Sequence, residues 1–255
     1  MNFLTAFHTD VGIKKKTNQD SLLLYQAQTE IGNVLLAVIC DGMGGLAKGE
    51  VASACMIQAF SEWFYSQLPP MLSAGLQPEA LRTSWEQLVS TVNHKITNYS
   101  IANSVSMGTT CAALLMINNT YYIMNIGDSR IYLISDNIYQ LTKDQTYVQR
   151  EMDAGRMTYE QSLRDPQRNV LLQCVGASPV IEPDFFMGEV QINQCYMLCC
   201  DGFRHLVSPQ EMYQYMNPTA ATEPDTMQKY LVYLTELNKE RRETDNITVA
   251  LIRTY

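Results

Sequence analysis

The order of strand-like and helix-like stretches leaves this chain of 255 residues few possible folds. Apolar runs with strand character occupy residues 1–40, 109–134, 185–200 and 247–252. Amphipathic helix patterns occupy residues 50–68, 79–99 and 225–238, and a Ser-Pro-Gln-Glu capping box begins another helix at residue 208. Runs of strands followed by runs of helices are typical of the α+β class with mainly antiparallel sheets. Two helices in each half predict a central β-sandwich that helices cover on both outer faces.

The segment from about 142 to 183 differs from the rest of the chain. Its short helical pieces are interrupted by Gly155, Pro166 and Gly176, which disfavour a continuous helix or strand. We expect an irregular subdomain here, inserted between strands. A length of 255 residues suits one well-buried domain and is short for two, so the sequence predicts a single domain over residues 1–255.

The chain is acidic, because 18 Lys and Arg residues against 26 Asp and Glu residues give a formal net charge of −8. Its longest basic run is Lys14–Lys16, so nucleic acid and anionic membrane surfaces are poor partners. The longest apolar runs are far shorter than the roughly 20 residues of a membrane span, and the first ten residues lack a signal-peptide pattern. Most of the seven cysteines lie in apolar runs, which indicates reduced thiols in a cytoplasmic protein.

Aspartates stand at the ends of the strand-like runs. They are Asp20, Asp41, Asp128, Asp201 and Asp245. A single Asp-Gly pair is an ordinary turn, but a charged group beside a core strand is costly unless it is solvated, paired or bound to a metal. Five such residues, together with Gly42, Gly44 and Gly45, favour a ligand site. Carboxylates in a chain with only three histidines select magnesium or manganese over zinc or copper.

Six short motifs follow one another along the chain. They are Lys15–Asp20 (KKTNQD), Asp41–Gly45 (DGMGG), Gly108–Thr110 (GTT), Gly127–Arg130 (GDSR), Asp201–Gly202 (DG) and Asp245–Asn246 (DN). The series resembles the metal-dependent protein phosphatase (PPM) family, protein phosphatase 2C-like, and most of all its compact bacterial serine/threonine members. The resemblance extends from about residue 9 to residue 252. It implies a four-layer αββα sandwich, with residues 142–183 as the flap that borders the active site.

The resemblance also implies how the site would work. Asp41 would bridge two divalent ions, Mn²⁺ or Mg²⁺, and Asp201 and Asp245 would hold one of them. The carbonyl of Gly42 would help to hold the other ion, and Asp20 would bind it or order its waters. A water that bridges the ions, with its pKa lowered, would attack phosphorus in line and form no phosphoenzyme.

Two positions depart from the family pattern. Lys15 stands where the family usually has an arginine that grips phosphate; a lysine offers a point charge, or it is only a solvated member of the basic triplet. His205 stands where many members have an aspartate of a third, weaker metal site, to which Asp128 would also belong. Occupancy of that third site is left open, and His205 is either a partly exposed residue at the rim or an acid near the site. Asn246 would order the loop around the ligands.

Substrates and partners follow from the same resemblance. The substrates would be phosphorylated proteins, the targets of a serine/threonine kinase, and the chain would be a cytoplasmic monomer. The catalytic residues would be Asp41, Asp201, Asp245 and Lys15. The alternative is a catalytically weak or inactive pseudophosphatase that acts as a binding or scaffold protein on the same fold. Lys15 and His205 motivate it, whereas the presence of every residue expected to hold the two core ions favours catalysis.

Overall fold

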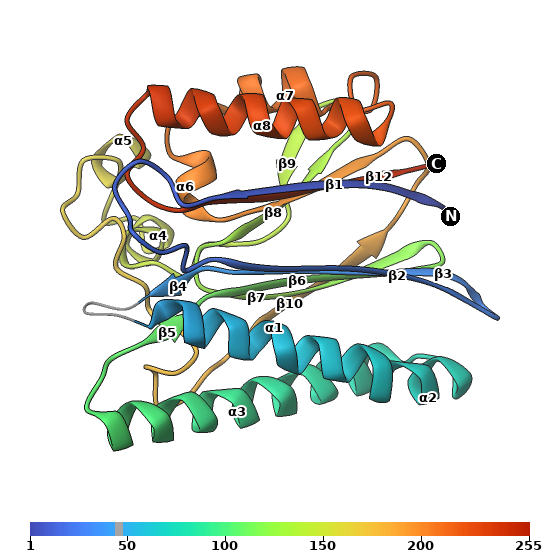
Figure 1. The fold of residues 1–255 in the computed structure, drawn as a ribbon, viewed down its shortest axis with the longest axis horizontal. Helices are drawn as coiled ribbons and strands as arrows, with labels where there is room; N and C mark the ends of the chain where they lie inside the picture. Colours follow the sequence, from blue (N-terminus) through green and yellow to red (C-terminus); the bar gives the residue numbers. More distant parts are fainter. Residues whose placement is uncertain (44–47) are drawn as a thin grey trace.

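Two five-stranded antiparallel β-sheets face each other in the computed structural model, which describes residues 1–43 and 48–255 (Figure 1). Helices cover the outer face of each sheet. The order of strand and helix patterns predicts this four-layer αββα sandwich, and the structure confirms it. Of the residues in the predicted DGMGG motif, Gly44 and Gly45 lie outside the described residues.

Each sheet pairs strands that are distant in the chain. The first sheet has the order β1 (Phe3–Asp10), β12 (Ile247–Thr254), β11 (Cys195–Cys199), β8 (Arg130–Ile134), β9 (Ile138–Gln140). The second sheet has the order β10 (Asp184–Glu189), β7 (Thr120–Ile126), β6 (Cys111–Ile117), β3 (Gly32–Cys40), β2 (Ser21–Thr29). A short ribbon pairs β4 (Gly42–Met43) with β5 (Gly108–Thr109). The strand β12 comes last in the chain and lies between β1 and β11.

The helices form the two outer layers and part of the site. They are α1 (Gly49–Ser66), α2 (Leu68–Ser73), α3 (Pro78–Asn103), α4 (Tyr147–Asp153), α5 (Tyr159–Ser162), α6 (Asp201–Arg204), α7 (Pro209–Met216) and α8 (Pro224–Glu240). The pair α1 and α3 covers the second sheet, and the pair α7 and α8 covers the first (Figure 1). The short helices α4 and α5 belong to the irregular stretch between β9 and β10.

The central strand β3 shows why the strand patterns are continuous apolar runs. Leu35 and Ile39 point into the core between the sheets, while Leu36 and Val38 point toward the helices. All four side chains have no exposed surface. Because both faces of the strand are covered, it cannot alternate apolar and polar residues as a half-exposed strand does.

Aromatic packing joins the two helices on the second sheet. Trp85 of α3 is fully buried and meets Phe60 and Trp63 of α1 edge-on, with ring centroids 5.7 and 5.6 Å apart. Such tilted pairs are the favoured geometry of aromatic rings. The apolar stripes predicted at residues 50–68 and 79–99 are therefore the surfaces through which α1 and α3 contact each other and the sheet.

Several short elements are not revealed by the sequence patterns, among them β4, α2, β9 and α6. Strand β9 and helix α6 have three and four residues, too few to show a period of two or of 3.6. Helix α6 begins at Asp201, one of the predicted site residues, two residues after β11 ends. Among the described residues, no helix is both long and apolar enough to cross a membrane.

Candidate metal centre

The five aspartates at strand ends gather at one edge of the sandwich. Asp20 and Asp41 flank the paired residues Ser21 and Cys40 of β2 and β3. In the first sheet, Cys199 at the end of β11 pairs with Arg130 at the start of β8 and with Val249 near the start of β12. Asp128, Asp201 and Asp245 therefore emerge at the same end of that sheet. The strand order brings together residues up to 225 positions apart in the chain.

Asp41 is held by the two threonines of the GTT motif. Its N–H donates to Oγ1 of Thr110 at 2.9 Å, and its carbonyl accepts from the N–H of Thr110 at 2.9 Å and from Oγ1 of Thr109 at 3.1 Å. The Thr110 hydroxyl also lies 2.9 Å from that of Ser129, in the GDSR motif. Burial, followed by the charges of the other four aspartates, raises the pKa of Asp41 well above its ordinary value.

Asp20 is, after Asp128, the least exposed of the five aspartates. It is only 9% exposed, and neither of its side-chain oxygens has a hydrogen-bond partner. Burial, together with the charges of Asp201 and Asp245, outweighs the opposing effect of the nearby Thr248 and Cys200 side chains and raises the pKa of Asp20 to about 7. The Oδ1 atom of Asp201 is likewise buried without a partner. Unpartnered buried carboxylate oxygens are costly, so their presence here fits a bound cation.

A lysine ammonium already stands among these carboxylates. The Nζ atom of Lys15 lies 2.8 Å from Oδ1 of Asp245. Burial tends to lower the pKa of Lys15, but its hydrogen bond to Asp245 and the charges of Asp245, Asp41 and Asp201 outweigh that effect and raise it. A positive charge is thus stable at this place, and Lys15 is not merely a solvated member of the basic triplet.

Asn246 fastens the lysine-bearing loop to the start of β12. Its Oδ1 accepts from the N–H of Gln19 at 2.9 Å, and its Nδ2 donates to the carbonyls of Val11 and Thr17 at 2.9 and 3.2 Å. The loop also passes very close to the Asp245 backbone at Gly12, which has a φ of +75°. A Cβ there would lie 2.3 Å from the Asp245 carbonyl oxygen, so only glycine fits.

Asp128 belongs to a buried network of arginines and carboxylates. Its Oδ2 lies 3.1 Å from Nη2 of Arg204, and burial together with the charge of Asp201 raises its pKa to about 6 although Arg204 opposes this. Arg130 binds both carboxylate oxygens of Asp144 at 2.8 and 2.7 Å, and Arg204 lies 3.7 Å from the same carboxylate. Arg204 is not among the site residues that the sequence motifs predict, although its place three residues after Asp201 puts both on one helical turn.

His205 connects two loops of the site. Its Nε2 lies 3.5 Å from Oδ2 of Asp201, and its Nδ1 lies 3.3 Å from Oε2 of Glu243. The other oxygen of Glu243 accepts from the N–H groups of Thr244 and Asp245 at 2.7 and 3.0 Å. Burial opposes the charged form of His205, but Glu243 and Asp201 outweigh it and raise its pKa above the usual value. His205 is therefore anchored between two carboxylates, while 24% of its side chain remains exposed in the cleft.

The oxygen donors of the five aspartates suit hard cations, although the side chains do not lie close together around one point. Across residues 1–43 and 48–255, no three or more His, Cys, Asp and Glu side chains lie close enough together to form a ready-made metal site. Three of the aspartates instead face a basic side chain: Asp245 faces Lys15, Asp201 faces His205, and Asp128 faces Arg204. The oxygen donors and the unpartnered atoms of Asp20 and Asp201 still fit Mg²⁺ or Mn²⁺.

Comparison with known proteins identifies the family. The family model described as Protein phosphatase 2C matches residues 12–234, which is most of the chain. The chain belongs to this family. The serine/threonine phosphatase stp of Listeria monocytogenes is 30% identical over 249 residues, covering 96% of this chain and 94% of that protein. The serine/threonine protein phosphatase PstP of Mycobacterium tuberculosis is 32% identical over 247 residues, which are 96% of this chain and 44% of PstP.

Solved structures of phosphatase 2C relatives share the fold. The serine/threonine phosphatase Stp1 from Staphylococcus aureus has a TM-score of 0.86 at 26% identity, over 100% of this chain and 96% of that one. The catalytic domain of PstP, solved in complex with two manganese ions, has a TM-score of 0.79 at 28% identity, over 98% and 97% of the two chains. The predicted family and fold class are confirmed.

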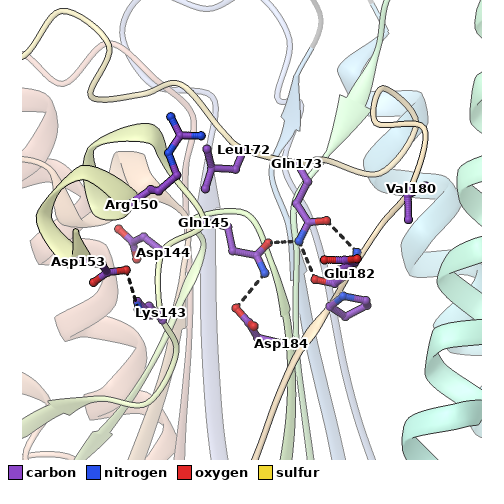
Figure 2. Close-up of a pocket in the computed structure, with 11 residues that line it drawn as sticks. Lys143, Asp144, Gln145, Arg150, Asp153, Leu172, Gln173, Val180, Glu182 and Asp184 are labelled. Atoms are coloured by element: carbon purple, nitrogen blue, oxygen red, sulfur yellow. Dashed lines mark hydrogen bonds and ion pairs between the residues drawn. The ribbon is translucent and has the colours of Figure 1, made fainter.

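Two cavities adjoin the flap of this phosphatase 2C fold, and of these only one is lined by strand-end aspartates. A cleft of about 720 Å³ runs from Asp128 and Asp245 toward α4 and α5. A second cavity of about 550 Å³ lies between the flap and β10, where Gln145 donates to Asp184 (Figure 2). None of the five strand-end aspartates lines the second cavity. The larger cleft is therefore the one that leads to the metal centre.

Proposed function

We propose that this chain is a metal-dependent protein phosphatase that hydrolyses phosphoserine and phosphothreonine. The observation that carries this proposal is the gathering of five aspartates at one edge of the sandwich, two of which have buried oxygens without partners. The named relatives are serine/threonine phosphatases, and one is solved with two manganese ions, which supports the same activity and the same two-ion requirement here.

The residues divide between holding ions and holding phosphate. Asp41 would contact both ions, Asp201 and Asp245 would hold one, and Asp20 with the Gly42 carbonyl would hold the other. Two bound divalent ions lower the pKa of a water to near neutrality and polarise the phosphate.

Lys15 would hold the phosphate while the ions act. It already shares its ammonium with Asp245, and we propose that it donates to the oxygens of the incoming phosphate. Asn246, which ties residues 11–19 to β12, would keep this lysine in place. Asp128 and His205 would not complete a third metal site of the usual kind, because Arg204 and Glu243 already engage them.

The remaining assignments concern the substrates, the location, the oligomeric state and the domain organisation. We propose that its substrates are phosphorylated proteins made by a serine/threonine kinase, and that it acts as a cytoplasmic monomer. We also propose that residues 1–255 form a single domain with a flap at about 142–183. The short helices α4 and α5 and the absence of long strands in that described stretch support the flap.

A phosphatase assay with matched variants tests this function. With Mn²⁺, the protein should release phosphate from a phosphothreonine peptide, and a chelator should abolish release. Asp41→Asn and Asp201→Asn should each lower kcat/KM by at least about a hundredfold, because the ions supply several kcal/mol of transition-state stabilisation. Asp225→Asn, an exposed carboxylate at the start of α8, is the control.

Two results would contradict the proposal. Full turnover by Asp41→Asn would show that the strand-end aspartates do not hold the catalytic ions. A folded wild-type protein that binds phosphoproteins but releases no phosphate with Mn²⁺ or Mg²⁺ would favour the alternative function as a scaffold.

A further inference from the structure

The cleft of about 720 Å³ continues well beyond the metal centre. At one end it is lined by Asp128 and Asp245. From there it passes between the flap, which contributes Tyr159 and Leu163, and the segment before α7, which contributes Leu206. These three apolar side chains are 65%, 53% and 38% exposed. A substrate whose phosphate lies at the aspartates must place neighbouring residues in this cleft.

Every carboxylate that lines the cleft already has a basic neighbour within 4 Å. The pairs are Asp128 with Arg204 at 3.1 Å, Asp144 with Arg130 at 2.7 Å, Glu243 with His205 at 3.3 Å, and Asp245 with Lys15 at 2.8 Å. Three of these carboxylates are thus compensated by a Lys or Arg side chain, and Glu243 is compensated when His205 is protonated. The cleft does not repel a second anion as strongly as the sequence charge of −8 suggests.

Two arginines that line the cleft form no ion pair with these carboxylates. Arg168 comes from the flap and Arg242 from the turn between α8 and β12, and both are exposed. Within the described part of the chain, neither has a carboxylate within 4 Å, and residues 44–47 contain no acidic side chain. Arg168 donates one bond to the carbonyl of Leu163 at 3.2 Å, which leaves most of its guanidinium for a ligand.

Four of the ten arginines in this chain have no ion pair among the described residues. Six of its arginines form ion pairs, at positions 82, 130, 150, 156, 204 and 241. Arg164 and Arg253 also have no ion pair among the described residues, but neither of them lines the cleft. The uncompensated charge of the cleft is therefore positive and belongs to Arg168 and Arg242.

We propose that Arg168 and Arg242 bind an anionic group of the substrate that lies a few residues from the phosphorylated one. The inference rests on the proposed phosphatase function and narrows its substrate class to acidic or multiply phosphorylated segments. A guanidinium presents a planar pair of donors that matches a carboxylate or a phosphate. An extended peptide advances about 3.3 Å per residue, so positions within four residues of the phosphothreonine can reach along the cleft.

A peptide series tests the proposal and separates the two anion sources. Each peptide carries one phosphothreonine and, at a single position from four residues before it to four after it, Glu, Gln or phosphoserine. With Mn²⁺, we expect at least one position where Glu raises kcat/KM over Gln by about threefold to tenfold, mainly through KM. Phosphoserine should exceed Glu at that position if a second phosphate is the preferred group.

Arginine variants connect the preference to the cleft. In Arg242→Ala and Arg168→Ala the Glu-to-Gln ratio should fall toward one, and Arg242→Glu should favour a Lys peptide instead. Arg242→Lys should keep part of the preference, since it keeps the charge. Arg164→Ala, on the flap outside the cleft, should keep the full ratio. Turnover of p-nitrophenyl phosphate, which has no flanking side chain, reports on the metal centre in each variant, and thermal melting reports on folding.

The outcomes distinguish this proposal from the function it rests on. If wild-type protein hydrolyses the Glu and Gln peptides equally at every position, the proposal is wrong and the phosphatase function stands. If no peptide is hydrolysed, the proposed function fails, and fluorescence anisotropy with the Asp41→Asn variant and labelled peptides still measures the preference. Equal binding of the Glu and Gln peptides in that measurement would overturn the role of both arginines.

Discussion

The ammonium of Lys15 faces two competing anions. It lies 2.8 Å from Oδ1 of Asp245, an expected metal ligand, and it is the proposed contact of the substrate phosphate. Both side chains are more than a third exposed, so the ion pair is screened by water and is weak. A weak pair suits a lysine that must give up Asp245 when a metal or a phosphate arrives.

Replacement of Lys15 should therefore separate metal binding from phosphate binding. In Lys15→Ala, we expect Mn²⁺ to bind about twofold to fivefold more tightly, because Asp245 loses a competing cation, while KM for a phosphopeptide rises. Lys15→Arg should lower KM, because a planar guanidinium can donate two hydrogen bonds to one phosphate, whereas an ammonium acts as a single point charge. Titration calorimetry with Mn²⁺ and steady-state kinetics measure the two effects.

Lys14→Ala is the matched control, because Lys14 is exposed beside Lys15 and has no ion pair among the described residues. Unchanged Mn²⁺ affinity in Lys15→Ala would mean that the contact with Asp245 does not compete with metal. An unchanged KM in both Lys15 variants would leave this lysine without a role in phosphate binding.

At the scale of elements, the site depends on a link between helix α6 and the turn before β12. His205 at the end of α6 lies between Asp201 and Glu243, and Glu243 also accepts the N–H groups of Thr244 and Asp245. One carboxylate thus positions two loops that carry expected metal ligands. Residues that orient ligands in this way often matter nearly as much as the ligands.

Glu243→Gln should loosen this link while keeping the side-chain shape. The amide retains an oxygen for the backbone N–H groups but removes the negative charge beside His205. We expect Mn²⁺ affinity to fall by about tenfold. Calorimetric titration measures the change, and Glu240→Gln, an exposed position at the end of α8, serves as the control. Equal affinities of the two variants would rule out a positioning role for Glu243.

The elements differ in how much of them the sequence reveals. The long helices α1 and α3 and the buried strand β3 carry strong apolar periodicity, so the αββα layers are predictable. Helix α6 is too short for a period, and Arg204 within it meets Asp128, which is 76 positions away. Partners of that kind depend on the final packing of the chain. For the same reason, the sequence could list five aspartates but could not assign Lys15 to Asp245 or His205 to Glu243.

At the scale of the whole molecule, the crowded carboxylates should make the metal-free protein sensitive to pH. The ordinary pKa of an aspartate is 3.8, but in the folded protein it is about 7 for Asp20 and about 6 for Asp128. The folded state therefore holds more protons than the unfolded state between roughly pH 4 and pH 7. The stability that this contributes is complete below the lower value and is lost as the pH rises through the upper one.

In a chelator, the melting temperature should accordingly be higher at pH 5 than at pH 8, by about 5 °C. The raised pKa of His205 acts in the same direction, because its charged form is favoured in the folded state. Saturating Mn²⁺ should reverse the trend, since metal binds the ionised carboxylates of the folded protein. Scanning calorimetry tests this, and Asp20→Asn should flatten the pH dependence in chelator. A melting temperature that rises from pH 5 to pH 8 without metal would contradict the expectation.

The place of β12 in the first sheet has a consequence for folding during synthesis. This strand is the last element of the chain, yet it separates β1 from β11 in the first sheet, and Asp245 immediately precedes it. As synthesis proceeds from the N-terminus, the second sheet has all its strands once residue 189 has been made, but the first sheet stays divided. A nascent chain can therefore complete the second sheet before the metal centre, which needs Asp245 and β12, can form. Phosphatase activity should begin only after β12 has been translated.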